Sequence, residues 1–283
     1  MALFAPLLPC SRLRTPDSRL PKPRTLFGAA ALLALAAFLL APAARGDAAP
    51  EAHGLFFSAN QAFRDNDFSR AAQDYETLAR QGRAGADVFF NLGNAYFRMG
   101  RLGLAIVNYE RARILAPRDP DVDYNLRHAQ GMRTDEAEKP GDFPAMGWLA
   151  KITGREAFLA FAVLNALFFL VLTLRSFRSW EWTWYAAIGL AILWTAGAFA
   201  GGLKVYQAAT DRRAVVVDDR IEVRAGPDEK ETLLFVLHAG TVVDQEREED
   251  GWRLVRFSED KRGWTPDAGV APVRPLFPEN PPS

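Results

Sequence analysis

Apolar residues are gathered into three continuous blocks, at residues 26–41, 157–174 and 182–203, and elsewhere apolar and polar positions are interspersed. The second and third blocks hold 18 and 22 residues and contain no charged side chain. At a helical rise of about 1.5 Å per residue, each comes close to the ~30 Å hydrocarbon layer of a bilayer. The pattern therefore predicts two transmembrane helices. The short loop between them makes a tight hairpin, so its flanking soluble parts are expected on one side of the membrane.

The first apolar block follows a basic stretch and ends in small residues, among which Ala41 and Ala43 fit the A-x-A cleavage rule. Residues 1–46 are therefore interpreted as a cleaved export signal or as an uncleaved N-terminal anchor. Basic residues flank both ends of the hairpin, so the hairpin alone does not define its orientation. Because the first element often dominates membrane orientation, we expect both soluble domains outside the cytoplasm.

A 34-residue pattern begins at Ala86. The stretch FFNLGNAYFRMGRLGLAIVNYERARILAP, residues 89–117, follows the order W-x2-L-G-x2-Y, A-x3-F and P with conservative aromatic exchanges, and it resembles a tetratricopeptide repeat. Residues 52–85 resemble a weaker first repeat, and residues 121–130 have the apolar spacing of a capping helix. The sequence thus predicts an α-helical array over residues 52–132.

Small residues recur inside this pattern at Gly93, Ala105 and Ala112. Two antiparallel helices can approach closely only where neither carries a bulky side chain at the crossing. We therefore interpret these three residues as structural crossing points.

The first helix of each pair is expected to line a concave groove, as in the proteins that this segment resembles. The residues predicted to line it are Phe56, Asn60, Phe63, Arg64, Phe90, Asn94, Phe97, Arg98, Tyr124 and His128. Asparagine amides can bond the backbone of an extended peptide, aromatic rings can hold its side chains, and arginine can bind a carboxylate. In the alternative interpretation the phenylalanines belong to the core and the arginines are merely solvated.

Residues 212–275 have the short β-prone runs and frequent glycine-containing turns of a small all-β domain. The order IEVRAGP, HAGTVV, DGWRLVRF and RGWTP resembles a bacterial SH3-like barrel. Trp252 and Trp264 are interpreted either as a peptide-binding surface or as core residues. The charged run DQEREED, residues 244–250, is predicted to be a solvated turn.

Two further segments have no regular apolar pattern. Residues 133–156 are polar and then rich in proline and glycine, and they are predicted to be a linker with an interfacial segment before the membrane. Residues 276–283 are rich in proline and are predicted to be a disordered tail.

Composition mainly excludes function classes. The 34 basic and 34 acidic residues balance, so overall charge gives no indication of nucleic-acid binding, and Cys10 is the only cysteine, so no internal disulfide can form. The three histidines lack metal-type spacing to acidic or thiol ligands, and no nucleophile, phosphate-loop or zinc-protease motif occurs. We therefore expect a non-catalytic protein without metal or cofactor.

The order of the predicted segments is similar to that in BatE-type proteins of the bacterial aerotolerance operon. These segments are the signal, the short repeat array, the membrane hairpin and the SH3-like tail. The stretch YFRMGRLGLAIVNYERARILAPRDPDVDYNLRHA carries the closest resemblance. This resemblance implies a multi-pass protein of the bacterial inner membrane that acts as a scaffold in an envelope complex linked to stress or oxygen tolerance. The implied partners are von Willebrand A-domain membrane proteins and a MoxR-type AAA+ ATPase. An alternative is a cell-wall sensor whose SH3-like domain binds peptidoglycan peptide.

Overall fold

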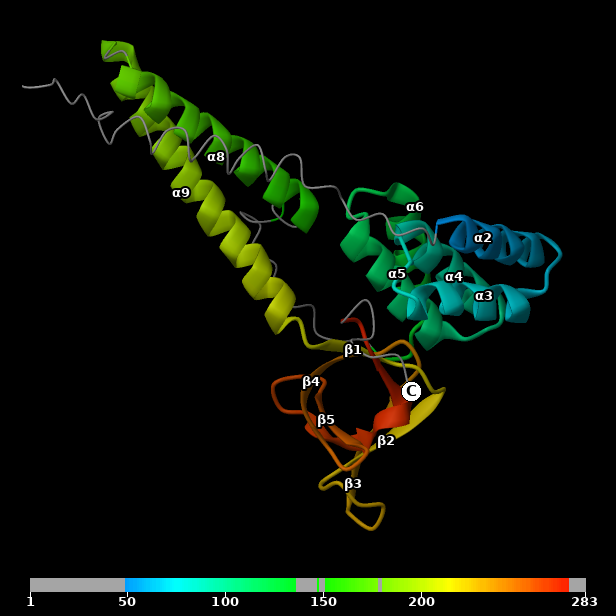
Figure 1. The fold of residues 1–283 in the computed structure, drawn as a ribbon. Helices are drawn as coiled ribbons and strands as arrows, with labels where there is room; N and C mark the ends of the chain where they lie inside the picture. Colours follow the sequence, from blue (N-terminus) through cyan, green and yellow to red (C-terminus); the bar gives the residue numbers. More distant parts are fainter. Residues whose placement is uncertain (1–48, 136–146, 148–150, 178–179, 275–283) are drawn as a thin grey trace, which may run out of the picture. The chain divides into compact units, whose positions relative to one another are not determined.

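The helices and strands of the computed structural model follow the order of the predicted segments (Figure 1). The structure describes residues 49–135, 147, 151–177 and 180–274. The predicted N-terminal signal or anchor, much of the predicted linker and the predicted tail lie outside these residues. The chain divides into two compact units, one of which contains Val163–Trp194 while the other contains the remaining described residues.

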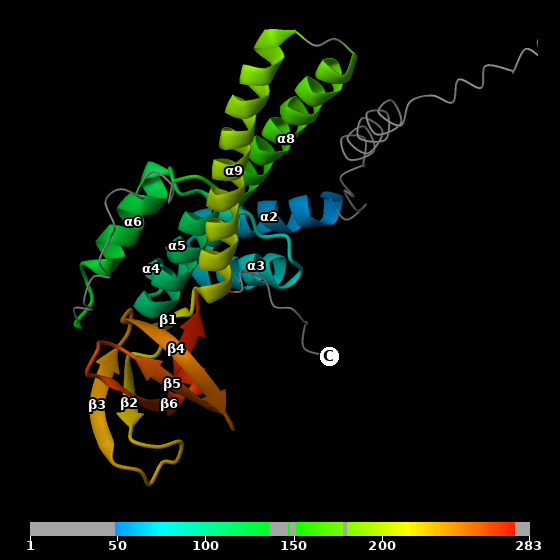
Figure 2. The ribbon, with the colours of Figure 1, turned by 90° about the vertical axis from the view of Figure 1, so that its left-hand side faces the viewer.

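Five helices of the larger unit stack side by side in chain order (Figures 1 and 2). They are α2 (Ala49–Arg64), α3 (Phe68–Arg80), α4 (Ala86–Arg98), α5 (Leu102–Leu115) and α6 (Pro120–Gln130). This array occupies the range predicted from the repeat pattern, so the helical part of the prediction is confirmed.

Local chemistry explains where these helices begin and end. Asp67 caps α3 by accepting a hydrogen bond from the backbone amide of Arg70 at 3.1 Å, and Asp119 caps α6 in the same way. Gly82 and Gly100 follow α3 and α4 with φ of 68° and 75°, a left-handed conformation that glycine adopts without steric cost. The connections between the helices are therefore short and sharply bent.

The predicted crossing residues lie in the core of the array. Ala105 and Ala112 are fully buried. A Cβ atom on Gly93 would lie 2.7 Å from the Tyr109 ring and 3.3 Å from the Ala105 carbonyl oxygen. The small side chains thus permit the close approach of α4 and α5, as predicted.

Two long apolar helices follow, α8 (Gly154–Phe177) and α9 (Glu181–Thr210). Both are long and apolar enough to cross a membrane, and almost all of their side chains lie on the surface. In the smaller unit the helices contact each other through the Phe168 and Trp194 rings, whose centroids are 6.5 Å apart. Each helix contains one of the predicted spans and extends beyond it.

The C-terminal part is an antiparallel sheet with strand order β3-β2-β6-β5-β4-β1-β7. Its strands are β1 (Arg213–Val216), β2 (Arg220–Arg224), β3 (Leu233–His238), β4 (Val242–Glu249), β5 (Trp252–Arg256), β6 (Arg262–Pro266) and β7 (Val270–Pro272). β3 and β7 are edge strands that do not pair with each other, so the sheet is not closed by hydrogen bonds. The all-β fold is confirmed, whereas the SH3-like barrel stays a prediction.

One prediction in this domain is wrong. The charged run predicted as a solvated turn belongs mostly to β4, which pairs with β5 through Glu249 opposite Trp252. The turn itself consists of Asp250 and Gly251, whose φ angles of 47° and 79° suit a tight two-residue hairpin. Charged side chains are tolerated because the outer part of β4 is exposed.

Candidate partner-binding groove

A hollow on the helical array brings together half of the residues predicted for the groove. It has a volume of about 220 Å³ and receives side chains from α2, α4, α5 and α6. Its lining residues are Phe63, Asn94, Phe97, Arg98, Tyr109, Asn125 and His128. Tyr109 and Asn125 are the two that the sequence analysis does not assign to the groove.

The side-chain amide of Asn94 is held by two hydrogen bonds in this hollow. Its Oδ1 accepts from the Tyr109 hydroxyl at 2.8 Å and from Asn125 Nδ2 at 2.9 Å. Because both lone pairs of Oδ1 are used, the amide has one orientation, and its Nδ2 remains as the donor. Within the described ranges this Nδ2 group has no hydrogen-bond acceptor.

The first repeat contains the same arrangement around Asn60. Asn60 Oδ1 accepts from the Tyr75 hydroxyl at 2.6 Å and from Asn91 Nδ2 at 3.2 Å. Each member of this network lies 34 residues before its counterpart in the second repeat. The sequence analysis missed the role of Asn91 and of its counterpart, although their 34-residue spacing is a signal by which both could be found.

Aromatic rings and the Arg98 guanidinium border the hollow. The Arg98 guanidinium lies 4.4 Å from the centroid of the Phe68 ring, a cation–π contact, and it has no carboxylate partner among the described residues. The Phe97 ring lies 5.6 Å from the His128 ring, and Tyr124 stacks on His128 at 6.3 Å. The surface therefore combines amide donors, ring faces and positive charge.

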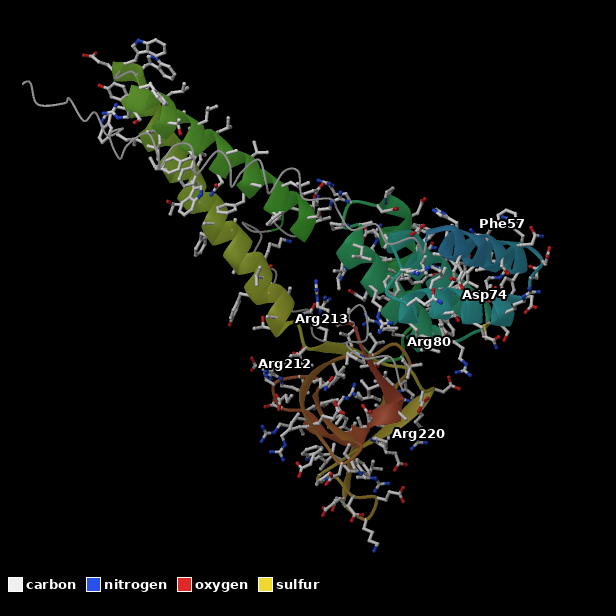
Figure 3. All side chains as sticks on the ribbon, in the orientation of Figure 1. Phe57, Asp74, Arg80, Arg212, Arg213 and Arg220 are labelled. Atoms are coloured by element: carbon white, nitrogen blue, oxygen red, sulfur yellow. The ribbon has the colours of Figure 1, made fainter. Side chains whose placement is uncertain are left out.

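The other residues predicted for the groove do not line the hollow. Phe56 and Phe90 contact the tyrosine ring of their own repeat and border the core. The Arg64 guanidinium donates to Gln61 Oε1 at 2.8 Å, away from the hollow. Phe57, which is 67% exposed on α2 (Figure 3), was not predicted. A role for these residues in binding a partner stays a prediction.

Burial changes the acidity of Tyr75, the tyrosine whose hydroxyl bonds Asn60. Burial raises the pKa of the Tyr75 hydroxyl to about 12, and it also raises the pKa of the Tyr109 hydroxyl. Both hydroxyls therefore stay protonated and keep donating to the asparagines at any physiological pH.

Residues 86–119 match the tetratricopeptide repeat. The match begins at Ala86, where the repeat is predicted to begin, and it confirms that prediction for the second helix pair. No curated protein and no solved structure matches the chain. The tetratricopeptide repeat is an interaction motif, so the hollow lies on a structure of the type that binds other proteins.

The opposite side of α5 from this repeat's groove contacts the sheet. Val215 of β1 and Val273, next to β7, share one apolar core with Ile106 and Val107 of α5. The Arg111 guanidinium donates to the carbonyl oxygen of Pro272 at 2.9 Å. The helical array and the sheet therefore share a packed junction.

A buried carboxylate crosses this junction. Glu110 is only 3% exposed and accepts hydrogen bonds from Arg113 at 2.7 Å and from Arg213 at 3.1 Å. Arg213, labelled in Figure 3, also donates to both carboxylate oxygens of Asp211 at 2.8 and 2.9 Å. Burial alone would raise the pKa of the Asp211 carboxyl, but the bonds and charge of Arg213 outweigh it and lower the pKa. This ion-pair network joins the array to the start of the sheet.

A second polar contact connects the end of the array to the last residue of β3 and to the turn that follows it. The Asp135 carboxylate accepts from the backbone amide of His238 at 2.7 Å and from the Thr241 hydroxyl at 2.9 Å. Burial would raise the pKa of the Asp135 carboxyl, but these hydrogen bonds, together with the His238 side chain, lower it. The charged form of Asp135 is therefore the one that holds the junction.

Two glycines allow the backbones to meet here. A Cβ atom on Gly103 would lie 2.1 Å from the Val216 carbonyl oxygen, which itself accepts a hydrogen bond from the Gly240 amide at 2.8 Å. The sequence analysis did not predict this junction. A signal was present in LGLAIVNYERARIL, residues 102–115, because its apolar residues are not confined to one face, as is expected of a helix that packs against neighbours on several sides.

The two tryptophans predicted for the SH3-like surface differ in exposure. Trp264 is buried, and the Arg247 guanidinium lies 5.2 Å from its ring centroid, whereas Trp252 is half-buried. They do not form a shared exposed platform. Peptidoglycan binding by this domain stays a prediction.

Within the described ranges, no group of three His, Cys, Asp or Glu side chains is arranged to hold a metal ion. Asp135 and Asp211 are two carboxylates whose pKa is lowered, and both bond residues at the junction, so a structural role accounts for their acidity. The chemistry that this part of the protein offers is recognition through amides, rings and a free arginine.

Proposed function

We propose that this protein is a membrane-anchored adaptor whose groove binds an extended, acidic segment of a partner protein. The proposal rests chiefly on the orientation of Asn60 and Asn94, since each has its oxygen saturated inside the protein and its Nδ2 left as a donor. Backbone carbonyls of an extended chain are the acceptors that such repeated donors suit.

The charge and ring surfaces support an acidic partner segment. Arg98 lies beside the hollow without a carboxylate partner in the described part of the chain, so an acidic side chain of the partner would pair with it. The rings of Phe97 and His128 offer contact area to an aromatic or aliphatic side chain.

Anchoring in a bilayer is supported by the long, exposed apolar surfaces of α8 and α9. Trp180, Trp182, Trp184 and Tyr185 cluster near the start of α9, as aromatic residues do at a membrane interface. An extracytoplasmic location of both soluble domains would follow from the N-terminal segment. Reporter fusions at residues 60 and 250 test this, and opposite sides or a shared cytosolic location would refute it.

The groove is tested by photocrosslinking in cells. A photoreactive amino acid replaces Phe97, and crosslinked partners are compared between wild type and the double variant Asn94→Ala, Arg98→Glu. The double variant should lose the partner, whereas Arg70→Glu, an exposed charge change on α3, should keep it. An unchanged set of partners in the double variant would refute groove binding.

The resemblance to BatE-type proteins adds candidate partners and a candidate biological role to the proposal. Its candidate partners are von Willebrand A-domain membrane proteins and a MoxR-type ATPase, and its candidate role is tolerance of stress or oxygen. Acidic extended segments of the A-domain proteins are the first peptides to test in the groove. If none binds, the BatE-type assignment loses its support while the groove itself remains testable with other partners.

A further inference from the structure

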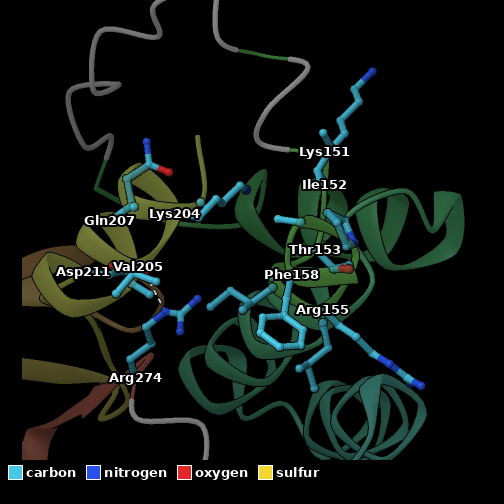
Figure 4. A pocket seen from close by; sticks show the side chains of 18 of the residues that line it. Lys151, Ile152, Thr153, Arg155, Phe158, Lys204, Val205, Gln207, Asp211 and Arg274 are labelled. Atoms are coloured by element: carbon cyan, nitrogen blue, oxygen red, sulfur yellow. Dashed lines mark hydrogen bonds and ion pairs between the residues drawn. The ribbon is translucent and has the colours of Figure 1, made fainter. Parts of the chain in front are cut away.

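A second, larger cavity lies away from the groove (Figure 4). It is open and has a volume of about 1340 Å³. Its walls are the end of α5, the first turns of α8, the last turns of α9 and the segment that leads into β1. Its lining residues all belong to the larger of the two units.

The cavity is strongly basic. Six basic and only two acidic residues line it. Three of the basic residues, Arg113, Arg213 and Arg274, already bond Glu110 or Asp211. These two carboxylates therefore bond three of the six basic residues. The other three, Lys151, Arg155 and Lys204, are additional positive charges.

The most central of the remaining cations is Lys204 of α9. Lys204 and Arg274 extend into the cavity, and the charge of Arg274 acts unfavourably on that of Lys204. Lys151 and Arg155 lie at the opposite rim (Figure 4). Lys204, Lys151 and Arg155 have no acidic partner in the ranges that the structure describes, so the charges of these three residues are not balanced there.

The remaining wall is apolar and contains free space. The Phe158 ring points into the cavity (Figure 4), and Phe161 also lines it. A Cβ atom on Gly201 or Gly202 of α9 would meet no atom within 4 Å. These glycines therefore leave open space on this face of α9, beside the basic residues.

The position of the basic residues at the ends of the apolar blocks also supports lipid binding. Lys204 directly follows the apolar block 182–203, and Arg155 lies two residues before the block 157–174. In a membrane-spanning hairpin both would lie at the level of the phosphates, where basic pockets attract anionic headgroups.

We propose that this cavity is a binding site for an anionic phospholipid. Its phosphate and headgroup pair with Lys204 and with the terminal nitrogens of Arg274, whose Nε bonds Asp211, and its acyl chain lies along Phe158 and the Gly201 face. Charge complementarity and the apolar lining contributed by α8 and α9 together favour a lipid over a soluble anion. The inference depends on the membrane anchoring in the proposed function, but not on groove binding.

The test uses the full-length protein extracted from membranes in a non-ionic detergent. Native mass spectrometry measures retention of added phosphatidylglycerol and of phosphatidylcholine with the same acyl chains. Wild type should prefer phosphatidylglycerol. Lys204→Gln should weaken phosphatidylglycerol binding about fivefold, the expected contribution of one basic residue near a lipid surface, and leave phosphatidylcholine unchanged. Gly201→Leu should reduce retention of both lipids by filling the space beside α9.

Lys230→Gln, an exposed lysine between β2 and β3, is the matched control and should change nothing. Equal retention of the two lipids, an unaffected Lys204→Gln variant, or displacement of the lipid by excess inorganic phosphate would overturn the proposal. Extraction of the native membranes with alkaline carbonate separates this failure from that of the anchor. Release of the protein refutes the anchor and with it the lipid site, whereas retention leaves the anchor intact.

Discussion

Substituting Gly103 with alanine tests the junction between the helical array and the sheet at its closest point. The added Cβ atom would lie 2.1 Å from the Val216 carbonyl oxygen and 2.7 Å from the Val217 Cα atom. Carbon–oxygen contacts in proteins are about 3.3 Å or longer, so β1 would have to retreat by about 1 Å. Both obstructing atoms are backbone, so no side-chain rotation relieves the clash.

We expect Gly103→Ala to lower the free energy of unfolding by about 2 kcal/mol. Overpacking typically costs about 1–3 kcal/mol, and the retreat of β1 also strains the bond that Val216 accepts from Gly240. Alanine regains only a few tenths of a kcal/mol in helix propensity, because Gly103 lies in the first turn of α5. The cost of overpacking therefore outweighs the gain.

Urea unfolding of the full-length protein in detergent, followed by circular dichroism, measures this change. Hydrogen exchange locates it, since the amides of Val216 and Gly240 should lose protection. Gly54→Ala in α2 is the matched control, because its Cβ atom meets nothing within 4 Å and the variant should be as stable as wild type or more stable. If Gly103→Ala is equally stable and equally protected, α5 and β1 do not touch in solution and the junction is refuted.

Three further predictions concern the core, the groove and pH. Ala105→Leu should cost about 1–3 kcal/mol in unfolding free energy by overpacking the crossing of α4 and α5, and an unchanged urea midpoint would contradict that crossing. Tyr109→Phe should cost about 1 kcal/mol and weaken partner binding, because Asn94 loses a bond that orients it; unchanged affinity would show that the orientation is irrelevant. The lowered pKa of Asp135 means that its contribution is complete above its ordinary value of about 4 and is lost as pH falls below it. The difference in unfolding free energy between wild type and Asp135→Asn should therefore be large at pH 6 and shrink below pH ~4, and a constant difference would refute this.

Periodicity made the helical array predictable. The 34-residue pattern places Gly93 and Ala105 at a crossing because their size has a local cause within one helix pair. The same logic extends to Asn94, whose bond to Tyr109 repeats in the first helix pair. Features that recur with the repeat leave a trace in the sequence.

The junction with the sheet has no counterpart in the 34-residue pattern. The atom that excludes a side chain at Gly103 belongs to Val216, and nothing periodic connects the two positions. The turn predicted over residues 244–250 was wrong because a run of charges conceals the strand, whose partner β5 supplies the apolar side chains. Contacts between segments that are distant in the sequence could therefore be identified only from the structure.

The position of α5 explains how the proposed groove and the sheet can both adjoin the same helix. Tyr109 and Glu110 are consecutive, yet the first reaches Asn94 in the groove and the second reaches Arg213 at the junction. Groove residues come mainly from α2, α4 and α6, whereas the sheet contacts α5. The sheet therefore leaves the groove open, and α5 is the wall that the two share. A partner in the proposed groove would therefore be linked through α5 and Glu110 to Arg213, three residues after the end of α9.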